Sequence, residues 1–69
     1  MVKNRLLAIR LSLGYKKQKD FAKFIEVSQV SYNKWENNSN QPSLDMVLKI
    51  SKLLNIKIED IVFLEDGEQ

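Results

Sequence analysis

Apolar residues recur every three to four positions in five short stretches of the chain, which is the spacing of helices rather than strands. The first stretch begins near Val2 and ends before Gly14, which stands where a helix C-terminus favours a positive φ. The second contains the run "FAKFI" and ends at Glu26, a non-glycine residue where the turn requires a left-handed backbone. The pattern predicts helices over about residues 3–13 and 18–25.

The third stretch, "VSQVSYNKWENNSNQPS", combines one apolar face with an amide-rich outer face and loop. Ser28 is a good N-cap for a helix over about residues 29–37, because its hydroxyl can accept a free first-turn amide. Val27, Tyr32 and Trp35 are expected to face inward. The remaining side chains of this helix are therefore left for contact with another molecule.

The last two predicted helices follow the loop "NNSNQ", which ends at Pro42. Ser43 is expected to cap the fourth helix, and Asn55 to end it in the left-handed region. The fifth helix begins near Ile58. An alternative for "IVFLED" is a short strand that pairs across a dimer, because β-branched and aromatic residues cluster there.

Composition and length favour one small intracellular domain. A chain of 69 residues suits a single domain, expected over residues 1–64 with an acidic tail over 65–69. It has no cysteine and no leader or membrane-spanning run, which fits a cytoplasmic protein. It also has no histidine, so an enzyme is not expected, and neither is a metal or other cofactor.

Charge is divided unevenly along the chain. Residues 1–34 hold eight basic and two acidic side chains, a net charge of +6, whereas residues 35–69 hold three basic and seven acidic ones, a net charge of −4. A basic half favours a polyanionic partner, although a run of charges is more often a solvated surface.

The outer face of the third predicted helix carries the side chains that read base edges in double-stranded DNA. In the major groove, Gln and Asn match adenine, Lys reaches guanine and a small apolar group packs on a thymine methyl. Gln29, Val30, Asn33 and Lys34 supply these chemistries within about two helical turns. Two short helices joined by a tight turn are the arrangement that presents such a helix to DNA.

On these residues, the chain resembles the Cro/C1-type (XRE) helix-turn-helix family of transcriptional regulators over about residues 4–64, with the motif at 18–37. The matching runs are "NRLLAIR", "QKDFAKFIEVS", "YNKWEN", "PSLDMVLKISKLLNI" and "IEDIV". The resemblance implies an all-α, five-helix, lambda-repressor-like DNA-binding domain. It also implies a homodimer, expected through the fifth helix and the tail, on a palindromic operator.

The resemblance also implies roles for individual residues. Gln18 matches a position that meets a phosphate, and Ser28 a cap that touches the DNA backbone. Trp35 and Glu36 are assigned to structure, with Glu36 bonding nearby amides or a cation. The complete expected DNA-binding set is Lys17, Gln18, Ser28, Gln29, Val30, Ser31, Asn33, Lys34, Asn37, Asn38 and Asn40.

Two departures from the family pattern bear on this set. Lys17 replaces the usual Ser or Thr cap, which makes sense if a phosphate binds beside it. Asn38 replaces a glycine. The function implied is transcriptional regulation, as a repressor, and the rival hypothesis is a protein-interaction module on the same fold, like an antitoxin or antirepressor.

Overall fold

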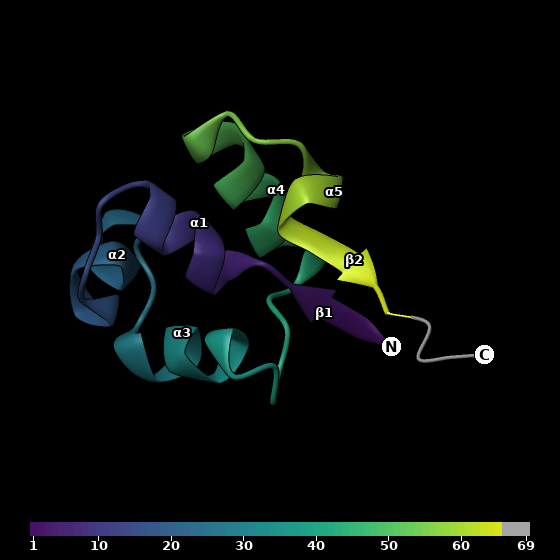
Figure 1. The fold of residues 1–69 in the computed structure, drawn as a ribbon, viewed down its shortest axis with the longest axis horizontal. Coiled ribbons are helices and arrows are strands. Elements are labelled where there is room, and N and C mark those ends of the chain that lie inside the picture. The colour runs from purple at the N-terminus through teal and green to yellow at the C-terminus, as the bar shows by residue number, and fades with distance from the viewer. Residues whose placement is uncertain (66–69) are drawn as a thin grey trace.

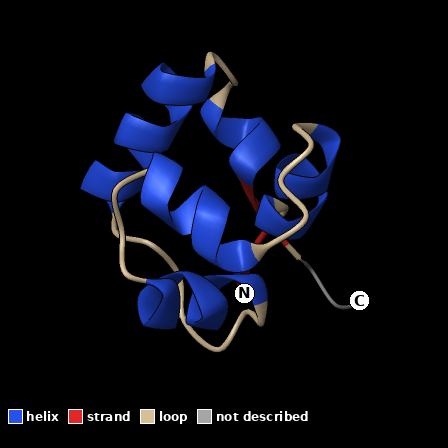
Figure 2. Cartoon of the chain, turned by 90° about the vertical axis from the view of Figure 1, so that its left-hand side faces the viewer, coloured by secondary structure: helices blue, strands red, loops and turns tan. Residues whose placement is uncertain are grey.

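The computed structural model describes residues 1–65, which form five helices and a short two-stranded ribbon (Figure 1). The elements are β1 (Val2–Asn4), α1 (Leu6–Ser12), α2 (Gln18–Phe24), α3 (Gln29–Glu36), α4 (Leu44–Leu54), α5 (Ile58–Ile61) and β2 (Val62–Leu64). In the view of Figure 2, the ribbon lies behind the helices. The predicted all-α, five-helix class is confirmed, with the ribbon as a minor addition.

The ribbon joins the two ends of the described chain. β1 and β2 are antiparallel, with Val2 opposite Leu64 and Asn4 opposite Val62, and the backbone N–H of Glu65 donates to Met1 at 2.8 Å. Two expectations are corrected here. Helix α1 begins at Leu6 rather than residue 3, because the preceding residues pair with a strand about sixty positions away, which local periodicity cannot reveal. The expected alternative strand exists, but its partner is β1 of the same chain.

Most of the predicted helix boundaries are confirmed by their backbone geometry. Ser28 and Ser43 cap α3 and α4, each hydroxyl accepting from the backbone N–H three residues ahead. Asn55, Glu26 and Gly14 have φ of 56°, 64° and 89° at the three helix ends where a left-handed residue was expected. These turns set the order and direction of the helices from α1 to α5.

The core lies among all five helices, and aromatic side chains hold α2 against α3. The ring of Tyr32 meets Phe21 edge-on with centroids 5.4 Å apart, and meets Trp35 at 6.2 Å. Tyr32 and Phe21 are fully buried and Trp35 is 8% exposed, so the expectation that α3 turns these rings inward is confirmed. The buried apolar cluster comprises Leu6, Ile9, Phe21, Ala22, Ile25, Tyr32, Trp35, Ile50 and Ile61.

Candidate nucleic-acid interface

A tight turn joins α2 to α3. Glu26 takes the left-handed conformation, and the backbone N–H of Val27 returns to the carbonyl of Ala22 at 2.9 Å. Ser28 then starts α3 by accepting from the N–H of Ser31 at 3.1 Å. With the inner faces of both helices fixed by their aromatic contacts, the turn determines which side chains of α3 face outward.

The outer face of α3 carries the side chains that the sequence singled out. Gln29, Val30, Ser31, Asn33 and Lys34 are all exposed. Val30 is 69% exposed, although it is apolar. Four of the five (Gln29, Val30, Asn33 and Lys34) line one shallow hollow on this face. The structure therefore brings the expected base-reading residues together on one surface.

Beneath this surface lies a buried ion pair. Arg10 of α1 donates from Nε to Glu36 of α3 at 2.6 Å, and the two side chains are 8% and 5% exposed. Arg10 also donates to the carbonyls of Tyr15 and Lys16 at 2.9 and 2.8 Å. The guanidinium thus connects three segments: α1, the loop before α2, and α3. The expectation that Glu36 bonds a cation is confirmed.

Three side chains at the ion pair, Arg10, Tyr32 and Glu36, have shifted pKa values. Burial alone would raise the pKa of Glu36, but hydrogen bonds from Arg10, Tyr32 and Gln18 outweigh this, and the pKa lies below its ordinary value. The hydrogen bond to Glu36 raises the pKa of Arg10. Burial, reinforced by the Glu36 carboxylate, raises the pKa of Tyr32, so its hydroxyl stays protonated. Glu36 is therefore a fixed negative charge inside the domain at neutral pH.

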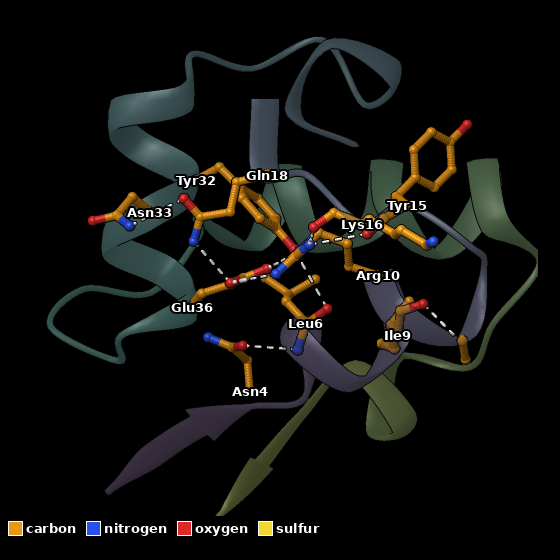
Figure 3. Close-up of polar contacts among 11 residues, drawn as sticks. Asn4, Leu6, Ile9, Arg10, Tyr15, Lys16, Gln18, Tyr32, Asn33 and Glu36 are labelled. Atoms are coloured by element: carbon orange, nitrogen blue, oxygen red, sulfur yellow. Dashed lines mark hydrogen bonds and ion pairs between the residues drawn. The ribbon is translucent and has the colours of Figure 1, made fainter. Parts of the chain in front are cut away.

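Gln18 links the ion pair to the outer face of α3 (Figure 3). Its Nε2 donates to Oε1 of Glu36 at 2.9 Å, and its Oε1 accepts from Nδ2 of Asn33 at 3.1 Å. Oδ1 of Asn33 in turn accepts from Nδ2 of Asn37 at 3.2 Å. The expected phosphate contact of the Gln18 side chain would therefore compete with two bonds inside the protein.

The loop after α3 divides the three asparagines of the expected set. Asn37 and Asn40 are exposed. Asn38 is half-buried with φ of 58°, and its Oδ1 accepts from the backbone N–H of Asn4 at 3.1 Å and from Nε2 of Gln41 at 2.9 Å. Asn38 therefore has a structural role, because its carboxamide oxygen holds the loop to β1.

Lysine side chains provide the exposed positive charge near α2. Lys17 is the N-cap residue of α2, exposed and making no capping hydrogen bond with its side chain. Lys16, Lys19 and Lys23 are also exposed. Arg10 belongs to the basic half of the sequence, but Glu36 neutralises it inside the domain. The exposed basic charge near α2 is therefore carried by lysines.

Sequence reasoning missed Asn4. This side chain is 9% exposed, and its Nδ2 donates to the carbonyl of Trp35 at 2.7 Å and to Oε1 of Gln41 at 2.8 Å. Its Oδ1 accepts from the N–H of Leu6, the first residue of α1, at 2.9 Å. An asparagine before an apolar run is a helix-start signal, and it would have moved the predicted start of α1 from residue 3 toward Leu6.

The described part of the chain contains no cluster of acidic side chains that could hold a metal ion. Among residues 1–65, no helix has the length and apolar character needed to cross a membrane.

The fold and this surface define a helix-turn-helix protein, and comparison with known proteins agrees. The model of the helix-turn-helix family of Cro/C1 type matches residues 6–61, so the chain belongs to that family. Because this family consists of transcriptional regulators, the expectation that the chain is not an enzyme is confirmed.

Two relatives illustrate the similarity. A protein of Methanocaldococcus jannaschii, named as an uncharacterized HTH-type transcriptional regulator, is 39% identical over 67 residues, which cover 97% of this chain and all of the relative. The crystal structure of a candidate DNA-binding protein from Bacteroides fragilis superposes with a TM-score of 0.70 at 28% identity. That match covers 91% of this chain and the whole of the solved one.

Proposed function

We propose that the protein is a sequence-specific, double-stranded-DNA-binding transcriptional regulator that acts in the cytoplasm as a repressor. The observation that carries this proposal is the division of α3 into two faces. Tyr32 and Trp35 fix one face in the core, while Gln29, Val30, Asn33 and Lys34 share the exposed one. Family membership and the names of both relatives support DNA binding.

In this proposal α3 enters the major groove. Gln29 and Asn33 carry paired donors and acceptors suited to adenine, Lys34 carries donors suited to guanine, and Val30 can pack on a thymine methyl. The exposure of Val30 is compatible with this assignment, because it leaves the side chain accessible to a base in the groove. These four residues would carry the sequence preference.

A second group would hold the DNA backbone and set the position of α3 in the groove. Lys17 offers a charge for a phosphate, and Ser28, Ser31, Asn37 and Asn40 offer exposed hydroxyls and amides around α3. Such contacts would raise the affinity for every sequence and make binding sensitive to salt.

We also propose a homodimer on a palindromic operator, because one copy offers few base contacts. Half-sites would lie about 34–36 Å apart, one helical turn of DNA. The surface that supports this proposal is formed by α5 and the ribbon, where Val2 and Leu64 are apolar and 45% and 73% exposed. The expected contribution of the tail falls largely on residues 66–69, which lie outside the described residues. Repression would follow from occupancy of the operator.

Selection of bound DNA from a random duplex library tests the proposal. Enrichment of a palindrome, with affinity that falls steeply as salt rises, is the expected result. Absence of any enriched sequence would favour the rival function, in which the same fold binds a protein.

A further inference from the structure

The buried carboxylate of Glu36 determines which groups donate and which accept in the hydrogen bonds that lead through Gln18 to Asn33. An ionised carboxylate accepts hydrogen bonds and donates none. Glu36 is held ionised by Arg10, so the group that meets its Oε1 from α2 must be a donor. In the carboxamide of Gln18, only the NH₂ side satisfies this requirement. The orientation of Gln18 therefore follows from charge rather than from a free choice between its two ends.

The order of donors and acceptors set by Glu36 continues through Gln18 to Asn33 at the protein surface (Figure 3). With its NH₂ on Glu36, Gln18 presents its oxygen to α3, and Nδ2 of Asn33 donates to it at 3.1 Å. Oδ1 of Asn33 then accepts from Nδ2 of Asn37 at 3.2 Å. Rotating the Asn33 carboxamide by half a turn would place two oxygens face to face and two NH₂ groups face to face.

We infer that Glu36 and Gln18 are positioning residues for base recognition: they fix which side of the Asn33 carboxamide donates and which accepts, and so direct Asn33 toward adenine. The inference rests on the proposed function, since it concerns the DNA that this surface would read. Gln18 then acts on sequence preference through Asn33, in addition to any contact it makes with a phosphate.

The remaining hydrogen-bonding capacity of Asn33 supports adenine. A carboxamide has two N–H donors and two acceptor lone pairs. Gln18 uses one donor and Asn37 one acceptor site, which leaves Asn33 with one of each. The major-groove edge of adenine offers one acceptor, N7, and one donor, the N6 amino group. An asparagine free to rotate would present the same pair in either order.

The test compares sequence preferences, by selection and sequencing, among the unmodified protein and three variants. Asn33→Ala identifies the base pair that Asn33 reads. Gln18→Met keeps the length of the side chain and leaves the Arg10–Glu36 pair in place, but removes both hydrogen bonds. Lys17→Ala, at the neighbouring position, is the matched control, because the Lys17 side chain makes none of the hydrogen bonds of this network.

We expect Gln18→Met to lower the preference for adenine at the base pair identified by Asn33→Ala by about fivefold or more, with the rest of the motif unchanged. Lys17→Ala should weaken all sequences alike. If Gln18→Met also weakens all sequences alike, with the adenine preference intact, the inference is overturned. If the unmodified protein enriches no sequence, the proposed function fails and the inference fails with it.

Side-chain amide signals in ¹H–¹⁵N spectra of the free protein provide a readout that does not require DNA. The Asn33 signals should move toward those of an unrestrained asparagine in Gln18→Met and stay in place in Lys17→Ala. Unchanged Asn33 signals in Gln18→Met would show that Gln18 does not orient Asn33, and would overturn the inference even if DNA binding is established. A thermal unfolding curve confirms that each variant is folded.

Discussion

Arg10 of α1 and Glu36 of α3 form an ion pair of 2.6 Å beneath the proposed DNA-binding surface, with both side chains at least nine-tenths buried. The guanidinium also donates hydrogen bonds to two loop carbonyls, and Gln18 donates a further hydrogen bond to the carboxylate. One interaction thus holds α1, the loop before α2, and α3 together. The reading surface is therefore supported by a polar centre as well as by the aromatic core.

Removing the carboxylate charge should destabilise the domain strongly. Glu36→Gln leaves the guanidinium of Arg10 buried without its counter-ion, so we expect the free energy of unfolding to fall by about 3–5 kcal/mol. Urea unfolding followed by tryptophan fluorescence measures this change, because Trp35 lies in the core. The double variant Arg10→Met with Glu36→Leu removes both charges and should cost much less. A loss below about 1 kcal/mol for Glu36→Gln would show that the pair does not hold α3.

Stability should also depend on acidity through Glu36. Its pKa in the folded protein is below the ordinary value of 4.5, so folding favours the ionised form. The stabilisation from this group is complete above pH 4.5 and is lost as the pH falls through the lowered pKa. Urea unfolding between neutral pH and pH 3 should show a shallower decline for the Arg10→Met, Glu36→Leu double variant than for the unmodified protein. Equal declines would assign the acid sensitivity to other carboxylates.

Replacing Gln29 should reduce sequence preference more than general affinity for DNA. Gln29→Ala removes a proposed pair of hydrogen bonds to a base, so binding to the selected operator should weaken by about 1–3 kcal/mol. Binding to random duplex should change little. Anisotropy titrations with both duplexes measure the two losses side by side. A uniform loss on both would remove Gln29 from the base-reading set.

Asn4 should matter for stability although it lies far from the proposed reading face in sequence. Asn4→Ala removes the hydrogen bonds to the N–H of Leu6, to the carbonyl of Trp35 and to Gln41, so we expect the free energy of unfolding to fall by about 2 kcal/mol or more. Lys52→Ala, at an exposed position of α4, is the control and should change it by less than about 0.5 kcal/mol. Similar values for both variants would show that the Asn4 contacts are not maintained in solution.

The helices could be predicted from the sequence because their signals are local. Serine caps, left-handed turn residues and apolar spacing lie within a few positions of the elements they specify, as at Ser28 and Asn55. The pairing of the ribbon could not be predicted in this way, although β-branched and aromatic residues indicated a strand at β2 as an alternative. Its two strands are three residues each and pair across almost the whole chain, so each gains its stability from a partner that local patterning does not show.

The candidate site was predictable in part for the same reason. The outer residues of α3 follow from the helix period once Tyr32 and Trp35 are turned inward. The contacts of Gln18, Asn38 and Arg10 depend on which helices meet, so the sequence alone could not separate a DNA-facing amide from one bonded within the protein. Asn38 shows this clearly, because its oxygen is occupied by Asn4 and Gln41.

DNA reading by α3 is tested most directly by selection and sequencing of bound duplexes from a random library at low and moderate salt, followed by anisotropy titration of the selected sequence. We expect an enriched palindrome, with affinity that falls steeply as salt rises because bound cations are released from the DNA. Absence of an enriched sequence, together with no salt-dependent binding, would show that α3 does not read DNA and would direct the search to a protein partner.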